Sequence, residues 1–443
     1  MTYLPNADAE RAEMLKALEL DSVDGLFKHL PEALRLERVE LPEPLSEVEL
    51  VQYIRELGRL NARISPSHSF LGGGASRRFS PAIVNQVISR PDFYTTYTPY
   101  QAEASQGTLQ ATYEFQTMIT LLTGLDVSNA SLYDGATALA EATGMAVAHT
   151  NRHNVVVAGA LHPEYAQVLK TYSEAQQYEI LRVSPGADGR IDLAKLEQAI
   201  TGTTAAVILQ HPNFYGVLED PQATSDLAHR SGALLIVCVD PISLGILAPP
   251  GEYGADLAVG DGQPLGIPLS FGGPYVGFIA CTEALTRRMP GRLVGATVDA
   301  QGRRGYVLTL QAREQHIRRE HATSNITTNH ALMAIAATVY LAHMGGEGLK
   351  QLAHLSAQRA HHLAAQLVER KGYRLAFDGP FLWEFVMRTP YPAEQTQAFM
   401  LERGVLPGLP LGRFFPELSD ALLISVTELN HPRAIERFLE ALA

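Results

Sequence analysis

The chain has 443 residues, of which 46% are hydrophobic and 19% are charged, and its formal net charge is −12. This length allows one large α/β domain and a smaller one, each with its own core. The acidic balance argues against nucleic acid and anionic membranes as partners, because both attract basic surfaces. The longest apolar run, Ala233–Val239, is too short to span a bilayer. Residues 1–10 lack the pattern of a targeting peptide, and Cys238 and Cys281 give no disulfide framework. We therefore expect a soluble, cytoplasmic protein.

Residues 1–60 are expected to form an arm of short helices. Asn6 or Asp8 can cap a first helix, and Ser46 can cap another helix over residues 48–60. Such an arm would lie on the larger body of the protein or on a partner.

Residues 61–330 alternate between strand and helix patterns, which predicts a large α/β domain. The runs Val155–Ala158, Ala205–Leu209 and Leu234–Val239 are short and apolar, as is typical of parallel strands covered by helices on both faces. The glycine-rich stretch Gly251–Gly277 is expected to be mostly irregular and to approach another group closely.

Residues 331–443 are predicted to form a smaller C-terminal α/β domain. A helix is expected over Ala331–Leu341, strands near Phe381–Met387 and Leu422–Val426, and a closing helix from His431.

Three signals occur in the order that is typical of the type I pyridoxal-phosphate-dependent fold. Gly135 and Thr137 open a helix whose free amides could hold a phosphate. His162 follows one predicted strand, where an imidazole would lie against the pyridine ring. Asp240 follows another, where an acid would pair with the pyridinium nitrogen. Each residue alone is as well explained by a helix cap, a loop or a strand end, but together they predict this fold.

The lysine that such a cofactor requires is missing. The cofactor is held as a Schiff base on a lysine amine, but no lysine occurs between Lys195 and Lys350. Gln263 stands where that lysine is expected, and an amide cannot form an imine. Lys170 and Lys195 fall on the polar faces of predicted helices beginning at Pro163 and after Asp192, so they are poor substitutes. The chain is therefore predicted to be no enzyme by itself, or half of one.

Several longer runs resemble the glycine cleavage system P-protein, the decarboxylating glycine dehydrogenase. They are YTTYTPYQ at 94–101 with Glu103 and SQG at 105–107, NASL at 129–132, PGEYGAD at 250–256, MPGR at 289–292, QAREQHIRRE at 311–320 and ATSNI at 322–326. The single-chain P-protein consists of two homologous halves and is about twice as long, and these runs belong to its amino-terminal half. The chain therefore resembles the alpha subunit, or subunit 1, of a two-chain P-protein.

This resemblance implies a reaction that is shared between two subunits. Glycine would bind as an imine to pyridoxal phosphate on the homologous beta subunit, lose carbon dioxide, and pass its aminomethyl group to the lipoyl arm of H-protein. The cofactor lysine would lie in beta, with Gln263 as its counterpart in this chain. The two subunits would form an alpha2beta2 heterotetramer through a large apolar interface, and this chain would complete the active site of beta.

The resemblance also suggests which residues reach that site. Tyr94, Tyr97 and Tyr100 are the first candidates for contact with glycine, together with Glu103, since a phenol combines apolar area with a hydrogen bond. The alternative is that these tyrosines only anchor the interface. Further candidates are Thr323 and Asn325, for the phosphate of the partner's cofactor, and the vestigial residues Gly135, Thr137, His162, Asp240 and Gln263.

Two other functions stay open: a catalytically silent scaffold that stabilises beta, and an autonomous pyridoxal-phosphate enzyme with a displaced lysine. The run Gly72–Gly74 is interpreted as a flexible loop, although with Arg77 and Arg78 it could cradle an anion. No metal site is expected, because His149 and His153 have no evident third ligand.

Overall fold

The structure is a computed structural model that describes residues 6–36, 39–61 and 64–442. It divides into two compact units, Met1–Ala62 and Arg63–Ala443, which are described one at a time. The predicted subdivision of the larger unit near residue 330 stays a prediction.

The smaller unit consists of short helices, as predicted. They are α1 (Asp8–Ala17), η1 (Val23–Phe27), η2 (Glu32–Leu34) and α2 (Glu47–Arg59). Ser46 caps α2 as predicted, because its hydroxyl accepts a hydrogen bond from the Glu49 N–H. The cap predicted for α1 is wrong: the N-cap residue is Ala7, and the Glu10 carboxylate accepts its N–H at 2.7 Å. These helices contain no buried residue, so they have no core of their own.

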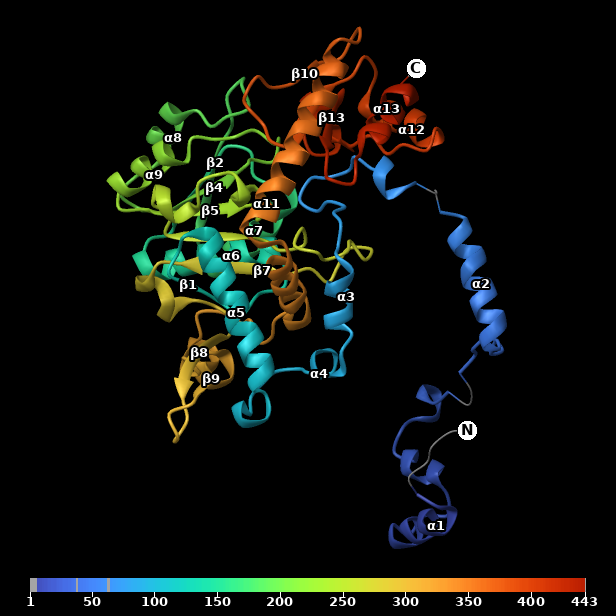
Figure 1. The fold of residues 1–443 in the computed structure, drawn as a ribbon. Coiled ribbons are helices and arrows are strands. Elements are labelled where there is room, and N and C mark those ends of the chain that lie inside the picture. The colour runs from blue at the N-terminus through green and yellow to red at the C-terminus, as the bar shows by residue number, and fades with distance from the viewer. Residues whose placement is uncertain (1–5, 37–38, 62–63, 443) are drawn as a thin grey trace. The chain divides into compact units, whose positions relative to one another are not determined.

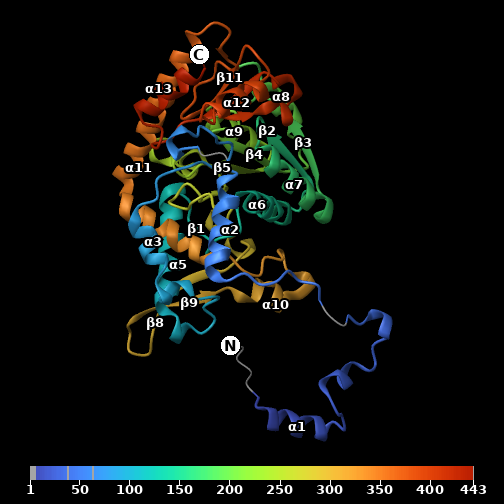
Figure 2. The same cartoon turned by 90° about the vertical axis from the view of Figure 1, so that its right-hand side faces the viewer.

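A seven-stranded sheet forms the centre of the larger unit (Figures 1 and 2). Its order is β1-β7-β6-β5-β4-β2-β3, and β3, β2, β4, β5 and β6 run parallel, while β7 is antiparallel to both β6 and β1. The strands are β1 (Val127–Ser128), β2 (Asn154–Ala158), β3 (Glu179–Val183), β4 (Thr204–His211), β5 (Leu234–Val239), β6 (Leu257–Asp261) and β7 (Gly277–Cys281). The three predicted parallel strands are confirmed as β2, β4 and β5.

Helices cover both faces of this sheet. Because successive side chains of a strand point to opposite faces, Val155 and Val157 of β2 pack in one apolar cluster, and Val156 and Ala158 pack in another. The first cluster contains residues of α6 and α7, and the second contains residues of α5, α8, α9 and α11. The helices are α3 (Ala82–Ile88), α4 (Pro91–Tyr94), α5 (Gln106–Thr123), α6 (Gly135–Thr150), α7 (Pro163–Gln176), α8 (Leu193–Ala199), α9 (Pro221–Arg230), α10 (Gln315–Arg318) and α11 (Ala331–Val368).

The long helix α11 runs from the large sheet to a smaller one (Figure 1). It begins at Ala331 as predicted but continues well past Leu341, with a break at Gly345. The smaller sheet is antiparallel, with the order β10-β11-β13-β12, and a separate hairpin pairs β8 with β9. The remaining elements are β8 (Leu293–Val298), β9 (Arg304–Thr309), β10 (Arg374–Leu375), β11 (Glu384–Arg388), α12 (Ala393–Glu402), β12 (Leu409–Pro410), β13 (Ala421–Ser425) and α13 (Pro432–Ala441). The strands predicted near residues 381–387 and 422–426 and the helix after His431 are confirmed.

The stretch Gly251–Gly277 is less irregular than predicted. It contains β6, whose five residues are all buried between β5 and β7. Glycine belongs in this strand because a Cβ at Gly260 would lie 2.5 Å from the Val239 carbonyl oxygen and 2.6 Å from the Phe278 ring. Residues 262–276 contain no helix or strand, as predicted.

Candidate functional site

The carboxyl ends of β2, β5 and β6 surround a small cavity, and the first turn of α6 is bonded to the end of β6. His162 follows β2, Asp240 follows β5 and Asp261 ends β6, and all three line the cavity. Its volume is about 70 Å³, whereas pockets for cofactor-sized ligands measure roughly 300–1,000 Å³. Of the predicted vestigial residues, His162 and Asp240 line this small cavity, whereas Gly135, Thr137 and Gln263 do not. The N–H groups of Gly135 and Gln263 are instead bonded to the Asp261 carboxylate, at 3.0 and 2.8 Å.

Gln263 connects the end of β6 to a distant part of the chain. Its side chain is 1% exposed. Its Nε2 donates to the carbonyl oxygens of Ser76 and Ile267, at 3.0 and 2.8 Å, and its Oε1 accepts the Ser76 N–H at 3.1 Å. The amide therefore acts as a structural bridge, a role for which it needs both its donor and its acceptor.

The segment Gly72–Ser76 occupies the space beside His162. The Gly73 carbonyl oxygen lies 2.7 Å from His162 Nε2, and the Gly73 N–H donates to Glu384 Oε1 at 2.9 Å. Gly74 has a φ of +107°, and a Cβ at this position would lie 2.6 Å from His162 Nε2, so a glycine is required here. The Gly73 N–H and carbonyl oxygen are both bonded within the site, so this N–H is not free to hold an anion. Burial lowers the pKa of His162, although the contact with Gly73 opposes this shift.

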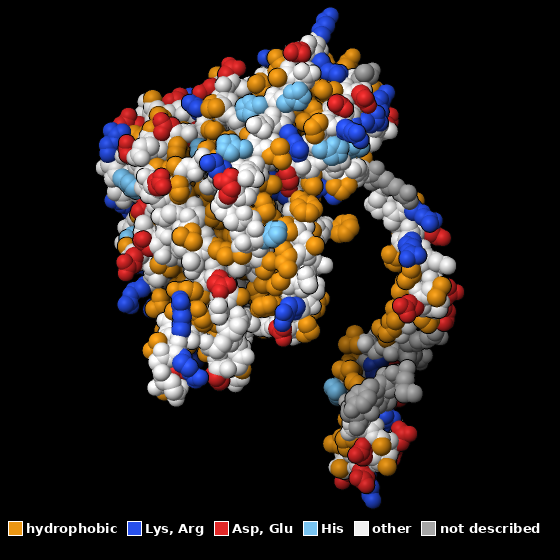
Figure 3. All heavy atoms as spheres, in the orientation of Figure 1, with side chains coloured by type: hydrophobic (Ala, Val, Ile, Leu, Met, Phe, Trp, Pro, Cys, Tyr) orange, Lys and Arg blue, Asp and Glu red, His pale blue; other side chains and the backbone are white. Residues whose placement is uncertain are grey.

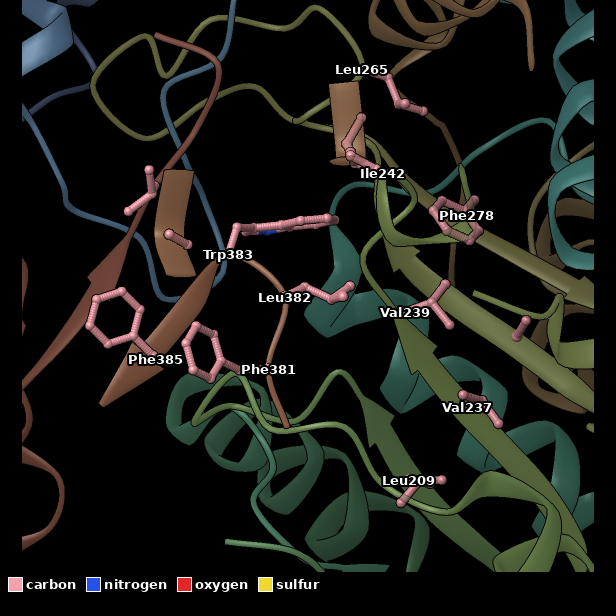
Figure 4. Close-up of a cluster of buried hydrophobic side chains, with 14 of the residues drawn as sticks. Leu209, Val237, Val239, Ile242, Leu265, Phe278, Phe381, Leu382, Trp383 and Phe385 are labelled. Carbon is pink, nitrogen blue, oxygen red and sulfur yellow. The ribbon is translucent and has the colours of Figure 1, made fainter. Parts of the chain in front are cut away.

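Asp240, predicted to face a pyridinium, has a protein donor instead. The Ile242 N–H donates to Asp240 Oδ1 at 2.9 Å. The Arg78 guanidinium, which lies 5.1 Å from the centre of the Trp383 ring, places a positive charge near this carboxyl group. Burial raises the pKa of Asp240, and the nearby Arg78 charge opposes that shift. Arg78 is itself 2% exposed and paired with Glu428 at 2.9 Å. In Figure 4, Leu382 and Trp383 extend from the chain leading into β11 toward Val239 and Ile242.

The first turn of α6 is satisfied by acids of this chain. Asp134 Oδ1 accepts the Thr137 N–H at 2.7 Å, and Asp261 Oδ2 accepts the Gly135 N–H at 3.0 Å. Burial raises the pKa of Asp261 to about 7. A phosphate would have to displace both carboxyl groups from the amides of this helix. Together with the small cavity and the amide of Gln263, this shows that the residues present do not fit pyridoxal phosphate.

A second group of candidates lies on the surface of the larger unit. Tyr94, Tyr97 and Tyr100 are all exposed, and Glu103 is exposed in the following 3-10 turn. Tyr97 lines a pocket of about 220 Å³ together with Asn329 and His330. The segment 94–101 therefore lies beside the residues that lead into α11.

Thr323 and Asn325 are also exposed, but they belong to different surroundings. Thr323 lines a small cavity of about 20 Å³ beside Arg288 and Arg313, and neither Thr323 nor Asn325 lines the pocket beside Tyr97. The neighbours of the tyrosine segment in the described structure are instead residues 327–330.

Four residues of the vestigial site were not predicted from the sequence: Arg78, Trp383, Glu384 and Asp261. The first three lie more than a hundred residues from the β5 and β6 ends that they contact, so no local pattern could connect them. Asp261 could have been found, because it ends an apolar run two residues before Gln263.

The described residues 6–36, 39–61 and 64–442 contain no group of three His, Cys, Asp or Glu side chains that could hold a metal ion. In the same residues, none of the helices combines the length and the apolar character that a bilayer crossing needs.

Comparison with known proteins settles the family. The model of the glycine cleavage system P-protein family matches residues 1–442. The chain belongs to this family. It is 51% identical over 443 residues to a probable glycine dehydrogenase (decarboxylating) subunit 1 of Carboxydothermus hydrogenoformans, covering 100% of this chain and 99% of that relative. A relative of the same description from Moorella thermoacetica is 50% identical with the same coverage.

Solved structures agree with this P-protein assignment. A crystal structure of glycine decarboxylase (P-protein) of the glycine cleavage system, in inhibitor-bound form, is similar with a TM-score of 0.91 and 44% identity, covering 100% of this chain and 99% of that one. A glutamate decarboxylase from Lactobacillus brevis has a TM-score of 0.67 at 13% identity, covering 94% of this chain and 97% of that one, so it supports the fold alone. The predicted family and the predicted type I pyridoxal-phosphate-dependent fold are confirmed, and the names of the relatives agree with the predicted function.

Proposed function

We propose that this chain is subunit 1 of a two-subunit glycine dehydrogenase (decarboxylating), and that pyridoxal phosphate is held by the homologous second subunit. The observation that carries the proposal is the closed vestigial site. Gln263 replaces the lysine and is bonded to Ser76, and the segment Gly72–Ser76 lies where a cofactor would need space. The names of the relatives, which specify a subunit 1, support the existence of a second subunit.

In this proposal the chain supplies part of the partner's active site. The cofactor on the partner would act as the electron sink for decarboxylation of glycine, and lipoylated H-protein would accept the aminomethyl group. Tyr94, Tyr97 and Tyr100 would contact glycine, with Glu103 beside them. Thr323 and Asn325 would face the phosphate of the partner's cofactor, and both are exposed and available for such a contact.

Exposed apolar side chains support an obligate interface between the two subunits in an alpha2beta2 assembly. In the larger unit they gather over α3, α5 and the first half of α11 (Figure 3). The exposed residues of this kind include Phe79, Ile83, Tyr94, Leu121 and the fully exposed Phe271. Obligate interfaces bury more than about 2,000 Å² and are rich in such side chains, so we expect the chain to be stable mainly as a complex.

Co-expression with the lysine-bearing homologous subunit tests this assignment. Sizing chromatography should give a single complex that survives dilution to micromolar concentration, and the complex should catalyse glycine-dependent carbon dioxide exchange with lipoylated H-protein. Each subunit alone should be inactive. Activity of the isolated chain would favour the autonomous enzyme, and a monomer that ignores the second subunit would refute the proposal.

Tyrosine-to-phenylalanine variants separate the completing role from a silent scaffold. Removing the hydroxyl of Tyr94, Tyr97 or Tyr100 should lower turnover by roughly tenfold for at least one variant, equivalent to about 1.4 kcal/mol of transition-state stabilisation. Tyr391→Phe is the matched control, because Tyr391 is equally exposed but belongs to the turn before α12. Wild-type rates from all three variants, with normal assembly, would leave the segment as an interface only.

A further inference from the structure

Arg292 is a buried arginine that connects three parts of the surface around Tyr100. It precedes β8 and is 4% exposed. Its Nη2 donates to the Thr327 carbonyl oxygen at 2.6 Å and to the Tyr100 hydroxyl at 3.3 Å, and its Nη1 donates to Asn329 Oδ1 at 3.4 Å. The guanidinium also lies 5.6 Å from the centre of the Tyr100 ring. One side chain therefore holds the tyrosine segment and residues 327–329 together.

The same contacts continue into the segment that precedes α6. Asn329 Nδ2 donates to Ser131 Oγ at 2.8 Å, and the Arg292 carbonyl oxygen accepts the Ala130 N–H at 2.8 Å. Tyr100, Thr327 and Asn329 all lie outside helices and strands, so these side-chain bonds are what fix them. Tyr100 is 59% exposed, yet its hydroxyl is held from behind.

The charge of Arg292 has no acidic partner in the part of the chain that the structure describes, and its Nε has no hydrogen-bond acceptor there. A buried guanidinium without a carboxylate is costly, which indicates that the charge serves a purpose other than stability. Because the Tyr100 hydroxyl accepts a bond from Arg292, its own hydrogen is free to donate outward. A bond from a cation strengthens that donor.

We infer that Arg292 is a positioning residue that aims the Tyr100 hydroxyl at the carboxylate of the substrate, an inference that rests on the proposed function. Glycine carries one carboxylate, and a phenol backed by a guanidinium is a suitable donor to a small anion. Arginine is required for this role because its planar fork reaches Tyr100, Thr327 and Asn329 at once, which the single ammonium of lysine cannot do.

The test measures ligand binding to the assembled two-subunit complex through the absorbance of the partner's cofactor. Glycine and methylamine, which lacks the carboxylate, are titrated against wild type, Arg292→Lys, Tyr100→Phe and the double variant. We expect each single variant to raise the Kd for glycine roughly tenfold, as for loss of one hydrogen bond to a charged group. The Kd for methylamine should change less than twofold. The double variant should bind glycine no more weakly than the weaker single variant, because both changes remove the same contact.

Arg304→Lys is the matched control, since Arg304 also lies over tyrosine rings, those of Tyr113 and Tyr306, but touches neither segment of the site. It should bind both ligands as wild type does. If Arg292→Lys fails to assemble, the Kd values of the exposed Tyr100→Phe variant for glycine and methylamine test the inference alone. Unchanged glycine binding in Tyr100→Phe, or equal weakening of glycine and methylamine, would overturn the inference and leave the proposed function intact. A wild-type complex without any glycine response would overturn both.

Discussion

A lysine placed at position 263 is expected to destabilise the chain without creating a cofactor site. Gln263→Lys removes three hydrogen bonds, two with Ser76 and one with Ile267. At roughly 0.5–1.5 kcal/mol each, their loss costs about 3 kcal/mol. The part-buried Ser76 N–H would lose its acceptor. An amine without a partner at position 263, which is 1% exposed, adds a further cost.

Pyridoxal phosphate should still be excluded from the Gln263→Lys variant, because Gly72–Ser76 still fills the space and Asp134 and Asp261 still hold the α6 amides. Urea unfolding measures the stability change, and absorbance followed by borohydride reduction measures imine formation. Gln263→Leu removes the same hydrogen bonds without adding an amine, so it separates the cost of the lost bonds from the cost of burying the lysine amine. Gln167→Lys, exposed on α7, controls for non-specific imines. A stoichiometric, borohydride-stable pyridoxyl adduct at position 263 of the single variant would refute this reasoning.

Two further predictions concern stability. Gly74→Ala should destabilise the chain by about 2–3 kcal/mol, through backbone strain and a clash with His162. Gly404 is the control, because it also has a positive φ but no atom lies within 4 Å of a new Cβ, so Gly404→Ala should be destabilised by backbone strain alone. Equal losses of unfolding free energy in urea for the two variants would contradict the clash. Burial raises the pKa of Glu141 from 4.5 to about 7, so the folded state binds this proton more tightly than the unfolded state does. The contribution of this group to the unfolding free energy is about 3 kcal/mol, is fully present below about pH 4.5 and is lost as pH rises through 7. Glu141→Gln should remove this pH dependence. An unchanged slope of unfolding free energy against pH would contradict this.

The elements and the order of the vestigial residues were predictable because local patterns encode them. Continuous apolar runs identified β2, β4 and β5, and the residues after their ends fell at one edge of the sheet because parallel strands share that edge. The α2 cap at Ser46 was predictable for the same reason: a capping box is a local pattern.

Closure of the site could not be predicted, since it depends on contacts between distant segments. Ser76 and Gln263 are 187 residues apart, and nothing in the sequence around Gly72–Gly74 shows that its backbone would be bonded to His162 and Glu384. The sequence identified Arg292 only as part of the run MPGR at 289–292. Its proposed role depends on the fold, which brings Tyr100 and Thr327 into contact with its guanidinium. The buried strand β6 was missed because Gly260 and Gly262 made it look irregular.

The location of the cofactor is the most direct test of the account. The assembled complex is saturated with pyridoxal phosphate and reduced with borohydride, and the pyridoxyl label is located by peptide mass spectrometry on both chains. The account predicts one label per pair of subunits, on a lysine of the second subunit, and none on this chain. A stoichiometric label on Lys170, Lys195 or any other lysine of this chain would contradict it.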